Sequence, residues 1–142
     1  MEWQRESYTI SDDSKRLDLE AVCRLVQGTY WASRRGKAAI ARSLRHSMCF
    51  GIYHASGQVG LARVVTDKTT VGYICDVVID EGHRGRGLAK WLLACIIEHP
   101  DLKECRLDLF TRDAQELYRF FGFGPHRYTS MVRYPPGREP SE

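Results

Sequence analysis

The sequence predicts an α/β protein with a mixed sheet, in which antiparallel strands come first and one βαβ unit follows. Two observations predict this class. An alternating pattern runs through residues 48–55 and 58–66, and Ser56-Gly57 between them is typical of a hairpin turn. A strand rich in β-branched residues, 71–79, then passes through a glycine-rich loop into a helical pattern. Helices before and after these segments would cover the sheet.

The N-terminal part of the chain predicts one short strand and two helices. Residues 8–10 are the strand. Apolar residues repeat at helical spacing from Leu19 onward, which predicts an amphipathic helix that stops at Gly28. A second, basic helix is predicted from Gly36 to His46.

The C-terminal part predicts a further strand, a helix and a last strand, at 105–110, 114–121 and 128–134. The expected order of elements is therefore β-α-α-β-β-β-α-β-α-β. We expect a single domain over residues 1–134, followed by a polar, disordered tail at 135–142.

Composition narrows the class of protein. The chain has 142 residues, 43% of them apolar, and a net charge of +3, which is too small to argue for nucleic acid and compatible with an anionic small ligand. No apolar run approaches the roughly 20 residues of a membrane span, and the N-terminus lacks an apolar signal core. Five scattered cysteines predict reduced thiols in a cytoplasmic protein. His46 and Cys49 alone do not make a metal site, and none is predicted.

The loop after the 71–79 strand has the chemistry of a diphosphate site. Its glycines, Gly85 and Gly87, let the backbone approach a ligand closely, and Arg84 and Arg86 add positive charge. The helix that follows leaves free N–H groups and a partial positive charge at its first turn. Together these features favour an anion such as a diphosphate.

The same loop resembles a known family. Arg84-Gly85-Arg86-Gly87-Leu88-Ala89 fits Q/R-x-x-G-x-G/A, the acyl-CoA signature of the GNAT superfamily of N-acetyltransferases. About 30 residues on, Ala114-x-x-Leu117-Tyr118-x-x-x-Gly122-Phe123 is similar to a segment near the GNAT C-terminus. The resemblance covers roughly 8–134, and the expected order of elements is that of the GNAT acyl-CoA N-acyltransferase fold. More narrowly, the chain resembles small bacterial-type members, with which it shares Tyr30-Trp31, Cys49-Phe50-Gly51, Ala62-Arg63-Val64, Thr66-Asp67, Asp76-Val77 and Thr111-x-Asp113-Ala114.

The resemblance implies acetyl-CoA as cofactor. It places the pantetheine arm along the strand and the diphosphate on the loop, and Thr111 stands where many members have a cofactor-contacting Asn. The implied cofactor-binding residues are Val77, Val78, Ile79, Arg84, Gly85, Arg86, Gly87, Leu88, Ala89, Lys90 and Thr111.

The resemblance also implies direct attack of a primary amine on the thioester in a ternary complex. Tyr118 occupies the position of the general-acid tyrosine, with packing on a helix face as the alternative. Asp76 is the leading general base, because alternation puts it on the apolar face of Ile74 and Val78, where burial would raise its pKa. The alternatives are a structural pair with Arg63, or a water chain without any single base.

The acceptor is a small-molecule or peptide amine of open identity. Tyr30 and Trp31 precede the second helix, where family members border the acceptor site, and could form an apolar wall or belong to the core. Asp67 and Asp76 would suit a cationic acceptor. A homodimer is compatible with the sequence.

Three other functions compete with this interpretation. A non-catalytic acyl-CoA-binding or sensor module would keep the fold and the loop. A dinucleotide site is suggested by Gly85-x-Gly87 and Asp108, but Lys90 stands where the third glycine belongs. The basic segment 34–45 could bind nucleic acid, but a solvated helix face explains it better, because its basic residues are interleaved with alanines and have little aromatic support.

Overall fold

The computed structural model describes residues 1–55 and 57–140. The chain divides into two compact units, one from Met1 to Thr111 and one from Arg112 onward, which are described separately. Ser56 of the predicted hairpin turn and the end of the predicted tail, 141–142, lie outside the described residues. The single domain over 1–134 therefore stays a prediction.

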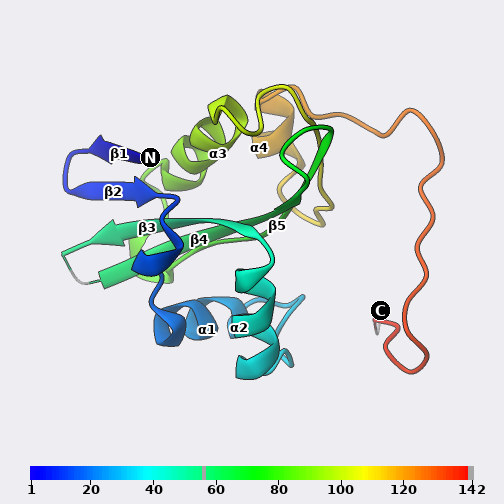
Figure 1. The fold of residues 1–142 in the computed structure, drawn as a ribbon, viewed down its shortest axis with the longest axis horizontal. Coiled ribbons are helices and arrows are strands. Elements are labelled where there is room, and N and C mark those ends of the chain that lie inside the picture. The colour runs from blue at the N-terminus through cyan, green and yellow to red at the C-terminus, as the bar shows by residue number, and fades with distance from the viewer. Residues whose placement is uncertain (56, 141–142) are drawn as a thin grey trace. The chain divides into compact units, whose positions relative to one another are not determined.

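The first unit is built on a six-stranded mixed sheet with the strands in sequence order (Figure 1). All neighbouring pairs are antiparallel except the last, in which β5 and β6 run parallel. The predicted mixed α/β class is thus confirmed. The strands are β1 (Glu2–Arg5), β2 (Tyr8–Ser11), β3 (Met48–His54), β4 (Gly57–Thr66), β5 (Val71–Ile79) and β6 (Arg106–Asp108).

Three helices cover the two faces of this sheet (Figure 1). α1 (Leu19–Gln27) and α2 (Lys37–Arg45) lie on one face, and α3 (Leu88–Glu98) lies on the other. Asp18 caps α1 through hydrogen bonds from the N–H groups of its first turn. Gly28 follows the last residue of the helix, where the sequence predicted its end. Two short 3₁₀ helices, Ser14–Arg16 and Glu81–His83, complete the unit.

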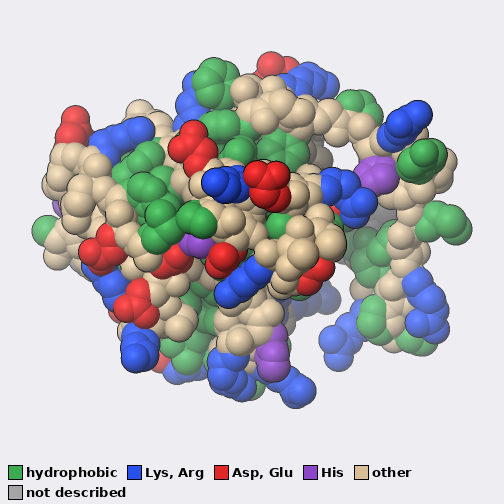
Figure 2. Space-filling model, turned by 45° about the horizontal axis from the view of Figure 1, so that its top comes forward, with side chains coloured by type: hydrophobic (Ala, Val, Ile, Leu, Met, Phe, Trp, Pro, Cys, Tyr) green, Lys and Arg blue, Asp and Glu red, His purple; other side chains and the backbone are tan. Residues whose placement is uncertain are grey.

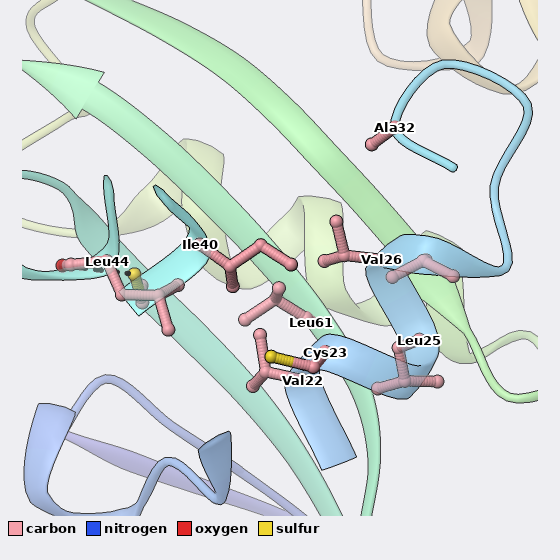
Figure 3. Packing of buried hydrophobic residues seen from close by; sticks show 10 residues of the cluster. Val22, Cys23, Leu25, Val26, Ala32, Ile40, Leu44 and Leu61 are labelled. Carbon is pink, nitrogen blue, oxygen red and sulfur yellow. Dashed lines mark hydrogen bonds between the residues drawn. The ribbon is translucent and has the colours of Figure 1, made fainter. Parts of the chain in front are cut away.

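One part of the core lies between α1, α2 and the sheet. Figure 3 shows Val22, Val26 and Ile40 of the helices pointing toward Leu61 of β4. All four side chains are buried almost completely, so this packing fixes the connection between α1 and α2 against β4 and β5. That connection carries Tyr30 and Trp31.

A bulge interrupts the pairing of β4 with β5. Leu61 pairs with Val78 and Arg63 with Cys75, so that Asp76 and Val77 together face Ala62. Asp76 has a φ of 53°, a left-handed conformation that is uncommon outside glycine. Because of this bulge, the predicted alternation of side chains between the two faces of the strand breaks at Asp76.

The face that Asp76 occupies follows from this register. Ile74 pairs with Val64, whose side chain lies on the opposite face from that of Arg63. The Asp76 carboxylate bonds to Arg63 and therefore lies on the face of Arg63 and Val78, not on the face of Ile74. An alternation of side chains with a period of two residues cannot predict the extra residue that the bulge inserts into β5.

β5 and β6 separate after a short parallel pairing. Only Val71, Gly72 and Tyr73 of β5 pair with β6, which ends at Asp108. Among the described residues, no strand pairs with the outer edge of β5 from 74 to 79. Apart from Ile79 O, which accepts a hydrogen bond from Arg84 Nε, the outward main-chain N–H and C=O groups of this edge are therefore open to other hydrogen-bonding partners.

The second unit contains α4 (Gln115–Phe120). Gly122, with a φ of 88°, ends the helix: its N–H donates to Arg119 O and the N–H of Phe123 donates to Tyr118 O. Ala114 takes the N-cap position without a side-chain hydrogen bond.

Two element predictions were wrong. Residues 128–134 form no strand, although their composition is typical of one; Tyr128, Met131 and Val132 are largely exposed, and a strand exists only where a neighbour completes its hydrogen bonds. Conversely, β1 was missed, because of its four residues only Trp3 is partly buried and the other three are polar. Its pairing with β2 specifies it instead.

Candidate acyl-CoA site and the Asp76 cluster

The loop between β5 and α3 has the conformation that its glycines permit. Gly85 and Gly87 have φ angles of 76° and 74°, in the left-handed region. A Cβ added to either glycine would meet no atom within 4 Å, so the space in front of both is open. An anion could therefore approach the backbone closely at these two positions.

The first turn of α3 supplies hydrogen-bond donors to the same space. Its N-cap is Gly87, which has no side chain to cap the helix. The N–H groups of Leu88 and Ala89 precede the first helical bond, which runs from Trp91 N to Gly87 O. Free N–H groups at a helix start suit a diphosphate, so the residues present fit the cofactor.

The two arginines of the loop have different settings. Arg84 Nε donates to Ile79 O at 3.0 Å, which ties the loop back to the end of β5. Arg86 is exposed. We therefore interpret Arg84 as a residue that shapes the loop and Arg86 as available charge for a phosphate.

Val77, Val78 and Ile79 lie on the part of β5 whose outer edge has no strand partner. An extended ligand with amide groups could pair with the main chain there, as a neighbouring strand would. The 3₁₀ helix Glu81–His83 follows this edge, and the loop after it is tied back to the end of the strand by the hydrogen bond from Arg84 to Ile79.

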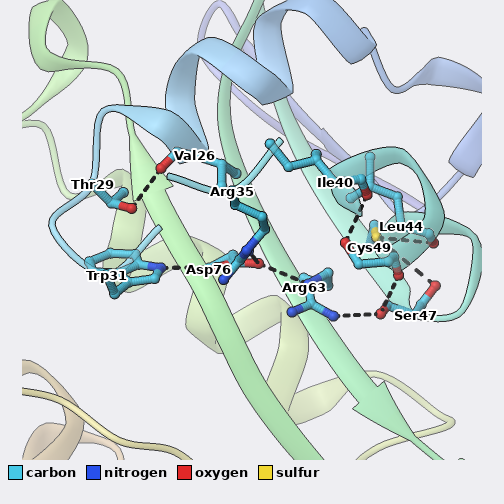
Figure 4. A network of polar contacts seen from close by, with 11 residues as sticks. Val26, Thr29, Trp31, Arg35, Ile40, Leu44, Ser47, Cys49, Arg63 and Asp76 are labelled. Atoms are coloured by element: carbon cyan, nitrogen blue, oxygen red, sulfur yellow. Dashed lines mark hydrogen bonds and ion pairs between the residues drawn. The ribbon is translucent and has the colours of Figure 1, made fainter. Parts of the chain in front are cut away.

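Asp76 lies at the centre of a polar cluster between the sheet and the α1–α2 connection (Figure 4). Its Oδ2 accepts hydrogen bonds from Arg63 Nε and Arg35 Nη1, both at 2.8 Å. Its Oδ1 accepts one from Trp31 Nε1 at 2.9 Å. We call Arg35, Asp76 and Arg63 the Arg35–Asp76–Arg63 cluster.

This setting determines the protonation of Asp76. Burial alone would raise its pKa, but hydrogen bonds from Arg63 and Trp31 and the charges of Arg35 and Arg63 outweigh burial and lower the pKa. The expectation of a raised pKa is therefore wrong, because the sequence did not show that two arginines converge on this carboxylate. The geometry instead shows the ion pair between Asp76 and Arg63, which was the alternative to a general base.

Asp67 and Asp108, the two other acids that the sequence analysis singled out, are also engaged. The carboxylate of Asp67 accepts hydrogen bonds from Thr70 and from the backbone of Thr69 and Val71, and the Thr70 bonds contribute most to lowering its pKa. It stabilises the turn between β4 and β5. Asp108 pairs with Arg106 on β6.

Tyr30 and Trp31 form an edge-to-face pair with ring centroids 5.0 Å apart. Their exposed fractions are 51% and 44%, so neither ring is a core aromatic. The hydrogen bond from Trp31 to Asp76 holds the pair close to β5. Sequence reasoning named both aromatics but missed Arg35, whose only signal was its place in a basic stretch.

Tyr118 and Thr111 belong to different units. Tyr118 lies on α4, half-buried, with its ring in an edge-to-face contact with Phe123 at 5.8 Å. Burial raises its pKa, and the charge of Asp113 adds to the effect, so the phenol stays protonated at neutral pH. Thr111 is the last residue of the first unit and is half-buried.

The described residues offer neither a metal site nor a membrane span. They contain no group of three or more His, Cys, Asp or Glu side chains that could hold a metal ion. No helix within 1–55 or 57–140 is long and apolar enough to cross a membrane. The five cysteines are free thiols. Basic and acidic side chains are interspersed on the face shown in Figure 2.

Comparison with known proteins agrees with this geometry. Residues 1–123 match the model of the family described as "Acetyltransferase (GNAT) family". A "putative acetyltransferase" of Gibberella zeae is 31% identical to the chain over 140 residues, covering 82% of this chain and 78% of the relative. The crystal structure of a "putative acetyltransferase belonging to the GNAT family" from Xanthomonas campestris pv. campestris superposes with a TM-score of 0.87 at 38% identity, covering 92% and 95% of the two chains.

A more distant relative carries a more specific name. The "Histone acetyltransferase TAP1" of Glycine max is 28% identical over 134 residues, which cover 83% of this chain and 56% of the relative. The chain therefore spans little more than half of that protein.

Proposed function

The chain belongs to the GNAT acetyltransferase family, and we propose that it is an N-acetyltransferase that moves an acetyl group from acetyl-CoA to a primary amine. The acceptor would be a small molecule or a peptide, and transfer would occur by direct attack in a ternary complex. The observation that carries the proposal is the open β5 edge leading through Gly85 and Gly87 into the uncapped start of α3.

The cofactor site would use main chain rather than side chains. The edge of β5 from Val77 to Ile79 would pair with the pantetheine amides, and the N–H groups of 85–90 would hold the diphosphate. Bound acetyl-CoA supplies the activated acetyl thioester. A main-chain N–H at the β5 bulge is suited to stabilising the oxygen that becomes anionic during attack, because an N–H dipole is fixed before reaction.

The acceptor amine must lose a proton, and Asp76 is poorly placed to take it. Its carboxylate already accepts three hydrogen bonds and its pKa is lowered, so it is a weak base. We therefore propose that Asp76 is a positioning residue that holds Trp31 and Arg35 against β5. Proton removal through water, without a single side-chain base, is the alternative that this geometry favours.

Tyr118 is proposed as the general acid that protonates the departing thiolate, and Thr111 as a further cofactor contact. Both assignments are supported by the family motif, and the raised pKa of Tyr118 suits a proton donor. Tyr30 and Trp31 are proposed to line the acceptor site, which their exposure and their link to Asp76 support. A cytoplasmic location is also proposed, and five free thiols support it.

Two measurements test the proposal. The melting temperature would be recorded with and without acetyl-CoA, with NAD as the control. At 100 times its Kd, a ligand that binds only the native state adds about 2.7 kcal/mol to the free energy of unfolding, which corresponds to a rise of several degrees. Release of free CoA thiol would then be followed with a panel of amines.

The outcomes separate the competing functions. A rise with acetyl-CoA alone, followed by amine-dependent thiol release, supports the enzyme. A rise without turnover on any amine would favour the non-catalytic acyl-CoA-binding module. A rise with NAD instead would contradict the cofactor assignment.

A further inference from the structure

The Arg35–Asp76–Arg63 cluster carries more positive than negative charge. Both guanidinium groups are charged at any physiological pH, and the single carboxylate between them is ionised. The net charge of the cluster is therefore about +1 by this count of charged groups. Such an excess in a partly buried place is stabilised when an anion binds beside it.

The two arginines differ in how fully the protein occupies them. Arg63 donates through Nε to Asp76 and through Nη1 to Ser47 Oγ, and its side chain is 14% exposed. The Arg35 side chain donates to Asp76 through Nη1 alone, and it is 28% exposed. Within the part of the chain that the structure describes, the Nε and Nη2 groups of Arg35 have no hydrogen-bond partner. These two nitrogens form one edge of the planar guanidinium, which matches the two oxygens of a carboxylate.

The segment of chain that carries Arg35 also carries two aromatic side chains and contains no acid. Trp31 and Tyr30 precede Arg35 on the same connection, and Trp31 bonds to the same carboxylate. The whole segment 28–45 contains no Asp or Glu. Asp67, which with Asp76 would have suited a cationic acceptor, is engaged in its own turn.

We propose that the acceptor is an amine that also bears a carboxylate, which the free edge of Arg35 binds while its apolar part packs on Trp31 and Tyr30. This inference rests on the proposed acetyl transfer and names the substrate class for it. Transfer would form a C–N bond between the acetyl carbon and the amine, break the C–S bond, and return the proton lost by nitrogen to the thiolate. The carboxylate would take no part in the bond changes.

The inference is tested with matched pairs of acceptors. Each pair would contain a free amino acid and its carboxamide, with the phenylalanine, tyrosine and tryptophan pairs first, because an aromatic part suits Trp31. The free acid should be acetylated with a kcat/KM at least about tenfold higher, mainly through a lower KM, as expected for a charge-assisted hydrogen bond. Amines that carry a phosphate in place of the carboxylate would be a third arm.

Variants separate Arg35 from general charge effects. Arg35→Gln should reduce the preference for the acid over its carboxamide about tenfold or more, because it removes the planar edge that would bind the carboxylate. Arg34→Gln removes the same charge from the neighbouring exposed residue and should keep the preference. Arg35→Lys, which keeps the charge without the planar edge, should give an intermediate value. Melting temperature and its rise with acetyl-CoA verify that each variant is folded.

The results distinguish this inference from the proposed function. Equal use of acids and carboxamides, a preference that survives Arg35→Gln, or a preference for phosphate-bearing amines would overturn the inference while acetyl transfer stands. If acetyl-CoA binds but no amine is acetylated, the proposed function fails. In that case the melting temperature is measured with each acid and its carboxamide. A rise with the acids alone that is lost in Arg35→Gln supports the anion site at Arg35. Equal melting temperatures with acid and carboxamide overturn it.

Discussion

Arg63 Nε and Asp76 Oδ2 lie 2.8 Å apart across the bulge in β5. The pair joins two neighbouring strands at the point where their regular pairing is lost. Asp76 also reaches Trp31, 45 positions away in sequence, so one carboxylate fixes both the strand proposed for the cofactor and the connection proposed for the acceptor. Its charge therefore matters to stability and to geometry at the same time.

Asp76→Asn keeps the shape of the side chain and removes its charge, and should lower the free energy of unfolding by about 3 kcal/mol at pH 7, because two arginines lose their counter-charge. The pKa of Asp76 is lowered from 3.8 in the folded protein, so its contribution is present above that value and is lost as pH falls through the lowered pKa. Urea unfolding from pH 7 to pH 3 should show the variant and the wild type converging below about pH 4.

Glu104→Gln removes a carboxylate from an exposed position and is the matched control, with an expected change within about 0.5 kcal/mol. The positioning role makes a second prediction for Asp76→Asn. The pH–rate profile above pH 6 should keep its shape while KM for the acceptor rises. Loss of a titration step in that range would instead restore Asp76 as the general base.

The residues of β5 and α3 explain how much the sequence could predict. Val77, Val78 and Ile79 form a β-branched run, and the glycines and helical spacing that follow specify a turn and a helix, so the strand, loop and helix were predicted together. These features are local in sequence. The helices α1 and α2 were predicted for the same reason.

Features that depend on distant partners were missed. The bulge at Asp76 arises from pairing with β4, and Arg35 joins the carboxylate from 41 positions away. The false strand at 128–134 had the right composition and no neighbouring strand to pair with. Propensity and periodicity describe single segments, whereas register, bulges and ion pairs are set by packing between segments.

Gly87→Ala should weaken acetyl-CoA binding. The residue has a φ of 74°, so alanine would cost about 1 kcal/mol of stability, and its methyl group would enter the open space proposed for the diphosphate. Affinity for acetyl-CoA, measured by calorimetry, should fall at least about tenfold. Gly57→Ala, at a φ of 114° in the hairpin between β3 and β4, should lose similar stability without loss of affinity. Equal affinities in both variants would argue against the loop as the cofactor site.

Tyr53→Phe should stabilise the protein. The Tyr53 hydroxyl is buried without a hydrogen-bond partner among the described residues, and burial raises its pKa to about 12. Removing an unsatisfied hydroxyl should raise the free energy of unfolding by about 1 kcal/mol, while Arg16 keeps its contact with the ring. Tyr8→Phe is the control with the opposite sign: its hydroxyl is 2.8 Å from His83 Nδ1, and its loss should cost about 1 kcal/mol. Urea unfolding measures both, and a destabilised Tyr53→Phe would show that this hydroxyl has a partner.

Tyr118→Phe should lower kcat by about 100-fold, the usual contribution of a positioned general acid, and should leave the rise in melting temperature with acetyl-CoA unchanged. The pKa of Tyr118 is raised above 10.0 by burial and by Asp113, so the wild-type phenol donates a proton at neutral pH. The wild-type rate should fall only as pH rises through that raised pKa, and the variant should lack this alkaline step. Tyr128→Phe changes an exposed tyrosine of the same unit and should alter neither quantity. If both variants turn over as fast as the wild type, Tyr118 is a packing residue on α4, and the thiolate leaves without an acid from this helix.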